Sequence, residues 1–150
     1  MTILRLGLAT ALAVALGTVA YSQTPPTIVT PNELKWSGSG APAGMWMATV
    51  AGNPDKTGVY VVRIKMNPGS KFLPHTHGQS ERVTVLQGTL LAGIGAKWDA
   101  SKMKALPAGS YVIMPAGVPH YVMAKDAVVI QVSGQGPMTT KMLSANGTHM

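Results

Sequence analysis

The chain has 150 residues, the size of one ordinary domain, and it contains no cysteine. The absence of cysteine excludes a disulfide framework, a thiolate nucleophile and a sulfur-ligated zinc or iron–sulfur site, so a metal ion would need nitrogen and oxygen ligands. The 12 basic residues exceed the 5 acidic ones, but the lysines are scattered and only 5% of the chain is aromatic, so no nucleic-acid interface is expected.

The first 22 residues have the layout of a secretory signal peptide. Arg5 precedes an apolar run that extends from Leu6 to Ala20, and the small residues that follow predict cleavage after Ser22. The run is too short to span a bilayer comfortably, so a cleaved signal peptide is favoured over an uncleaved membrane anchor. No membrane span is expected after cleavage. We therefore expect an exported protein that is periplasmic or extracellular.

Residues 23–44 are rich in Pro, Ser and Gly and predict an extended N-terminal arm. From residue 45 the pattern becomes that of strands, with short segments rich in β-branched residues between turn residues. Val62, Ile64 and Met66 alternate with charged side chains, which is the period of a strand with one solvated face. The predicted strands cover residues 45–50, 57–66, 81–87, 89–95, 110–115, 120–124 and 127–134.

One segment of the chain, from Asp99 to Leu106, has a helical pattern, and it would make two turns at most. The last residues, 139–150, show no periodicity and predict a flexible tail. Many short strands with closely spaced turn signals and no internal repeat predict an all-β fold over residues 45–138. The expected architecture is an antiparallel sandwich or barrel with at most one short helix.

Ligand-type residues gather in the stretch PHTHGQSE, which holds two of the four histidines. His75 and His77 are two positions apart, so on a strand their imidazoles project from the same face. Glu81 has the same parity, and its carboxylate can reach the same point if the chain continues from Gly78 into the next strand. His120 follows a turn rich in Pro and Gly and could face the first two histidines from a neighbouring antiparallel strand.

These two regions resemble the two halves of the cupin signature. The first half, G(X)5HXH(X)3-4E(X)6G, is matched at Gly69, His75, His77, Glu81 and Gly88. The second half, G(X)5PXG(X)2H(X)3N, is matched at Gly109, Pro115, Gly117 and His120, with Ala124 in place of the final Asn. The resemblance implies a double-stranded β-helix, or jelly-roll barrel, with architectural glycines at its strand ends. It also implies that one metal ion is bound by His75, His77, Glu81 and His120.

The ligand types leave the identity of the ion open among divalent Zn, Cu, Mn, Fe and Ni. The predicted cavity beside the ion is apolar, so we expect a small apolar ligand or substrate. The candidate wall residues are Trp46, Met47, Phe72, Val83, Val85, Met114, Val122 and Met123.

The cupin resemblance leaves the function open because this fold serves many activities. A dioxygenase-like oxidoreductase is the favoured activity, and a non-enzymatic module that binds a small ligand or a metal is the alternative. A metal-dependent isomerase or decarboxylase ranks third, since the predicted cavity offers few polar side chains. No separate general base is evident, so no catalytic residue is assigned beyond the metal ligands. By analogy with other small cupins we expect a homodimer.

Overall fold

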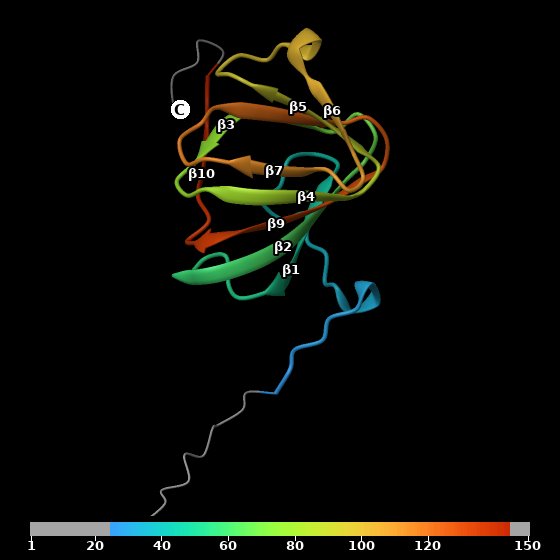
Figure 1. Ribbon diagram of the computed structural model, residues 1–150, viewed down its shortest axis with the longest axis vertical. Helices are drawn as coiled ribbons and strands as arrows, with labels where there is room; N and C mark the ends of the chain where they lie inside the picture. The colour runs from blue at the N-terminus through green and yellow to red at the C-terminus, as the bar shows by residue number, and fades with distance from the viewer. Residues whose placement is uncertain (1–24, 145–150) are drawn as a thin grey trace, which may run out of the picture.

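The computed structural model describes residues 25–144, so the predicted signal peptide and residues 145–150 of the predicted tail lie outside the described residues. This part of the chain consists mainly of β-strands (Figure 1). Its helical elements are two single-turn 3-10 helices, η1 (Pro31–Glu33) and η2 (Ala100–Lys102). No helix within residues 25–144 has the length and apolar character needed to cross a membrane.

The described residues form ten strands in two antiparallel sheets. The first sheet has the order β1-β2-β9-β4-β7 and the second the order β10-β3-β8-β5-β6. The strands are β1 (Met45–Ala51), β2 (Gly58–Met66), β3 (Lys71–His77), β4 (Glu81–Gln87), β5 (Thr89–Ile94), β6 (Lys104–Pro107), β7 (Tyr111–Met114), β8 (His120–Ala124), β9 (Val128–Gly136) and β10 (Thr140–Met142). The predicted jelly-roll class of antiparallel β-protein is confirmed.

The hydrophobic core lies between the two sheets because alternate residues of each strand point inward. Val62 and Met66 of β2 and Ile130 of β9 pack against Leu90 and Ala124 from the second sheet. Complete burial of one large aliphatic side chain contributes about 1.5 to 3 kcal/mol. This layer therefore stabilises the sheet pair that positions the site described below.

The prediction of a helix from Asp99 to Leu106 was wrong. Only η2 is helical there, and the Asp99 side chain caps it by accepting a hydrogen bond from the Ser101 amide at 3.0 Å. The following residues, Lys104–Pro107, form β6 and pair with β5. A segment of two turns is too short to be a stable helix alone, whereas the edge of β5 offers hydrogen bonds and Leu106 packs against the core.

The predicted flexible tail was wrong for its first residues. Residues 140–142 form β10, which pairs with β3, and Leu143 is 7% exposed. A three-residue strand is too short to show a period, so its position depends on its partner strand rather than on a local pattern.

The described part of the arm is attached to β1. Ser37 and Met47 exchange two backbone hydrogen bonds, of 2.9 and 2.8 Å. The ammonium group of Lys65 lies 4.8 Å from the ring centroid of Trp36 in the arm and 5.2 Å from that of Trp46 in β1. These contacts hold residues 39–42 beside the sheet pair, where they help to enclose a cavity.

Candidate metal centre

Three histidines come together from two neighbouring strands of the second sheet. His75 and His77 lie on β3, and His120 begins β8 directly opposite His75 in the antiparallel ladder. One ring nitrogen from each histidine lies within 4.8 Å of the other two. The expectation that His120 faces the other two histidines across the sheet is therefore confirmed.

The turn between β7 and β8 fixes the start of β8. The amide of Val118 donates to the carbonyl of Pro115 at 3.3 Å, and the amide of Gly117 donates to the carbonyl of His77 at 2.9 Å. Gly117 has a φ of +75°, a conformation that favours glycine. The second half of the signature is thus bonded to the first half, and this bond sets His120 relative to His77.

Each imidazole is oriented by a hydrogen bond between its Nδ1 atom and a backbone carbonyl. The bonds join His75 to Leu73 at 2.7 Å, His77 to Thr139 at 3.2 Å and His120 to Val118 at 3.0 Å. Because a carbonyl oxygen can only accept, each Nδ1 carries the ring proton. Each Nε2 therefore offers a lone pair for a metal ion.

Burial keeps the three imidazoles neutral. None of them is more than 9% exposed. Loss of hydration lowers the pKa of His77 and His120, and it lowers the pKa of His75 to about 3 with a further contribution from the neighbouring histidines. At neutral pH all three are in the form that binds a metal ion.

Glu81 approaches the histidines from the opposite sheet. It is the first residue of β4, and its Oε2 atom lies 3.3 Å from Nε2 of His77. Its Oε1 atom accepts a hydrogen bond of 3.0 Å from the hydroxyl of Tyr60. Loss of hydration raises the pKa of Glu81 and outweighs the opposing effects of Tyr60 and His120. The same burial, followed by the effect of the carboxylate, raises the pKa of Tyr60.

The chemistry of these donors fits a divalent transition metal. With its proton on Nδ1, His77 presents a lone pair to Oε2 of Glu81 at 3.3 Å, so two acceptors face each other when Glu81 is ionised. A cation between such groups relieves their repulsion, and the described lining of the cavity contains no Lys or Arg that could do so. Imidazole nitrogen with carboxylate oxygen is a ligand set that suits Zn, Cu, Mn, Fe or Ni.

The histidines lie in a mainly apolar cavity of about 630 Å³ between the sheets. Six of the predicted wall residues line it, namely Trp46, Met47, Phe72, Val83, Met114 and Val122. Val85 does not line the cavity because it is packed within the core cluster, where it is 2% exposed. Met123 does not line it because its neighbour Val122 does, and successive residues of a strand point to opposite faces.

Several parts of the site were not predicted from the sequence. Residues 39–42 of the arm, together with Met138 and Met142, help to line the cavity. The hydroxyl of Thr140 also lies 3.2 Å from Nδ1 of His77. No local sequence pattern in these segments predicts that they line the cavity, because their positions depend on pairing with distant strands.

Tyr60 was also missed, although the sequence contains a signal for it. Tyr60 has the same parity as Val62 and Ile64, which places its ring inside the sheet pair. A buried phenol requires a partner for its hydroxyl group, and here that partner is Glu81.

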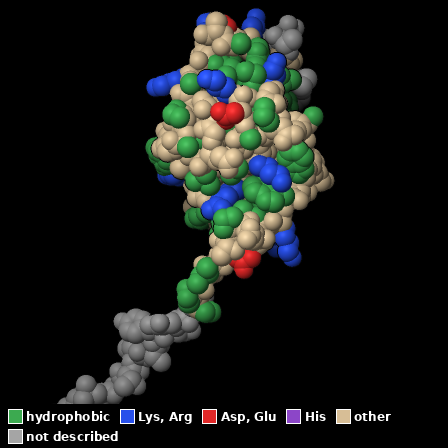
Figure 2. Space-filling model, turned by 90° about the vertical axis from the view of Figure 1, so that its right-hand side faces the viewer, with side chains coloured by type: hydrophobic (Ala, Val, Ile, Leu, Met, Phe, Trp, Pro, Cys, Tyr) green, Lys and Arg blue, Asp and Glu red, His purple; other side chains and the backbone are tan. Residues whose placement is uncertain are grey.

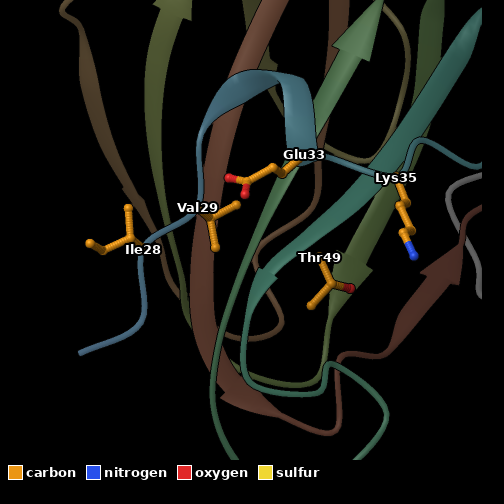
Figure 3. Close-up of a pocket in the computed structure, with 5 residues that line it drawn as sticks. All are labelled: Ile28, Val29, Glu33, Lys35 and Thr49. Carbon is orange, nitrogen blue, oxygen red and sulfur yellow. The ribbon is translucent and has the colours of Figure 1, made fainter. Parts of the chain in front are cut away.

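The face of the molecule drawn in Figure 2 does not show the same concentration of ligand groups. On the face drawn in Figure 2, Lys and Arg side chains are dispersed and no histidine is visible. A second hollow, of about 470 Å³, lies between the arm and Thr49 of β1 (Figure 3). Its carboxylate, Glu33, accepts hydrogen bonds from the amide and the hydroxyl of Thr30 at 2.6 and 2.8 Å, so this group serves as a helix cap.

The comparison with protein families identifies the class of this chain. The family model of the ChrR cupin-like domain matches residues 24–139. The chain therefore belongs to the ChrR cupin-like family. The two signature halves predicted the cupin superfamily, and this prediction is confirmed.

The chain is also similar to individual proteins of this fold. Auxin-binding protein ABP19b from Prunus persica is 33% identical over 116 residues, which cover 70% of this chain and 56% of that protein. The chain thus spans about half the length of the curated relatives it matches. Polyketide cyclase RemF from Streptomyces resistomycificus has a TM-score of 0.65 and 17% identity, covering 82% of this chain and 90% of that one. Salicylate 1,2-dioxygenase from Pseudoaminobacter salicylatoxidans has a TM-score of 0.57 and 16% identity, covering 68% and 30%. The two structural likenesses concern the fold alone.

Proposed function

We propose that this cupin binds one divalent transition metal ion and uses it to engage a small, largely apolar molecule in the cavity, with dioxygenase-type oxidoreductase chemistry. The metal ligands in this proposal are His75, His77, His120 and Glu81. The convergence of the three histidine nitrogens at the wall of an apolar cavity carries the proposal. The shared fold of salicylate 1,2-dioxygenase is consistent with it.

The side chains of the site have separate tasks in this proposal. The neutral imidazoles supply lone pairs, and Glu81 supplies a negative charge that offsets part of the charge of the ion. When bound, such an ion provides Lewis-acid chemistry and, in the case of Fe, Mn, Ni or Cu, one-electron redox chemistry. Trp46 and Phe72 exclude water from the cavity and contact the carbon skeleton of the ligand.

The wall also limits the chemical class of the ligand. Among the described residues that line the cavity, Glu81 is the only carboxylate and there is no Lys or Arg. A ligand therefore has to direct its polar group toward the histidine cluster and its apolar body toward the wall. A sugar substrate would leave many hydroxyl groups without hydrogen-bond partners in this cavity. The hypothesis of a sugar isomerase therefore ranks last.

A second candidate function is non-enzymatic binding of a small molecule. The observation that favours it is the similarity to a protein named as auxin-binding, with 33% identity over 116 residues. In this case the same cavity and ion would hold the ligand without turnover.

Oxygen uptake distinguishes the two candidates. We would supply the metal-loaded protein with phenolic and enol compounds and record dioxygen consumption with an electrode, using EPR to follow the ion. Consumption that disappears in His77→Ala supports the dioxygenase. Saturable binding of a compound without consumption of oxygen or compound would instead favour the binding module.

Export and the homodimer stay predictions. N-terminal sequencing of the mature protein is expected to begin at Gln23, and a mature chain that begins at Met1 would contradict cleavage. Light scattering of the mature protein is expected to give the mass of two chains, and the mass of one chain would contradict the dimer.

A further inference from the structure

Tyr60 reaches Glu81 across an intervening strand. Within the first sheet, β9 lies between β2 and β4. Gly134 of β9 pairs with Tyr60 on one side and with Glu81 on the other, so the three residues form one row. The Tyr60 hydroxyl bridges this row with its 3.0 Å hydrogen bond to Oε1 of Glu81.

Gly134 leaves the space that the phenol occupies. A Cβ atom at position 134 would lie 2.8 Å from the hydroxyl oxygen of Tyr60 and 3.1 Å from the ring carbon that bears it. These contacts are too close for the ring to keep its place. The absence of a side chain at Gly134 therefore leaves the phenol in the place from which it bonds to Glu81.

The bond divides the two carboxylate oxygens between different partners. Oε1 is engaged by the phenol, and Oε2 is the oxygen 3.3 Å from Nε2 of His77. Tyr60 is 1% exposed and Glu81 is 6% exposed, so neither oxygen can readily exchange its partner for bulk water. A carboxylate held in this way presents one oxygen to an ion bound by the histidines.

We propose that Tyr60 is a positioning residue of the metal centre, which holds Glu81 so that Oε2 alone faces the three histidines. Gly134 makes this possible by leaving the path between the two side chains open. The inference rests on the proposed function, because it takes Glu81 as a metal ligand. A free carboxylate would rotate and ligate with both oxygens or with neither, so loss of the phenol hydroxyl changes both the affinity for the ion and its coordination.

The test is Tyr60→Phe in the full-length mature protein, which removes one oxygen atom and keeps the ring. Tyr121→Phe is the matched control, because Tyr121 is also 1% exposed and donates a 3.0 Å hydrogen bond to the carbonyl of Asp99, outside the histidine cluster. Co²⁺ alone is the probe. Its affinity is measured by competition with a chromophoric chelator, and its visible absorption reports the coordination geometry.

We expect Tyr60→Phe to weaken Co²⁺ binding roughly 10- to 100-fold and to change the absorption of the bound ion. Tyr121→Phe is expected to keep the affinity and the spectrum even where its melting temperature falls. In a Glu81→Gln background, Tyr60→Phe should cause no further loss of affinity, because the group that it positions is absent. If Tyr60 had only a structural role, the losses of Co²⁺ affinity caused by Tyr60→Phe and by Glu81→Gln would add.

Gly134→Ala provides a second route if Tyr60→Phe does not fold. It displaces the phenol while retaining the hydroxyl, and we expect the same weakening and the same spectral change. A folded Tyr60→Phe protein could instead keep the wild-type affinity and spectrum while Glu81→Gln binds Co²⁺ more weakly. This result would overturn the positioning role of Tyr60 but not the assignment of Glu81 as a ligand. Failure of the wild-type protein to bind Co²⁺ through its histidines would overturn the metal assignment and this inference together.

Discussion

Acidification from pH 7 to pH 5 is expected to destabilise the metal-free protein through its buried histidines. His75 has a pKa of about 3 in the fold, against 6.5 for an ordinary histidine. Between these values the unfolded chain binds more protons than the folded one, so the contribution is complete above pH 6.5 and is lost as the pH falls toward 3. With 1.36 kcal/mol per pH unit, His75 alone accounts for about 2 kcal/mol of lost stability at pH 5.

Other groups of the site modify this value in known directions. The lowered pKa values of His77 and His120 add to the loss in acid. The raised pKa of Glu81 has the opposite sign, since its contribution is complete below the ordinary value of 4.5 and is lost as the pH rises through its folded pKa. A comparison with a His75 variant is therefore needed to isolate the effect of His75.

Urea unfolding of the chelator-treated protein at pH 7 and pH 5 provides the assay, followed by tryptophan fluorescence. The decrease in unfolding free energy between the two pH values should be about 2 kcal/mol smaller in His75→Gln than in the wild type. An equal decrease in the two proteins would refute the reasoning, because it would show that His75 titrates in the fold as it does in the unfolded chain.

Three further predictions concern the ligands, the cavity and the sheet that carries the histidines. His75→Ala and Glu81→Gln should each lower metal content and melting temperature together, and full metal content in either variant would show that the ligand set is wrong. Ala92 of β5 also lines the cavity. Ala92→Phe should therefore fill part of the cavity and weaken binding of a small apolar ligand at least roughly 10-fold without loss of metal, as measured by fluorescence titration and elemental analysis; unchanged ligand affinity would place the binding site elsewhere. Gly93→Ala should lower the unfolding free energy by about 1 to 3 kcal/mol, because its Cβ would collide with the ring of Tyr121; an unchanged melting curve would contradict this contact.

The fold could be predicted from the sequence wherever the signal is local. The period of two in Val62, Ile64 and Met66 depends only on the pleat of a strand, and the structure places Val62 and Met66 in the core. Strands β6 and β10 were missed because each is short and is defined by the partner with which it pairs. The arm could be predicted as a segment, but its place beside the cavity depends on the contacts of Ser37 and Trp36 with distant strands.

The candidate site, like the fold, could be predicted only where the sequence signal is local. The meeting of His75 with His77 follows from strand parity, and His120 follows from the turn before β8. Strand parity places Val83 on the inner face, where it lines the cavity, but Val85 has the same parity and lies deeper in the core. The bond between Tyr60 and Glu81 crosses β9, so no spacing within a single strand could have revealed it.

The central claim is that the histidine cluster holds a metal ion, and elemental analysis tests it most directly. We would measure the metal content of the mature protein, purified from its native compartment without added metal, beside that of His77→Ala and His120→Ala prepared in the same way. Our account predicts about one equivalent of a divalent transition metal in the wild-type protein and a large loss in both variants. A wild-type protein without metal, or variants that retain the full equivalent, would contradict it.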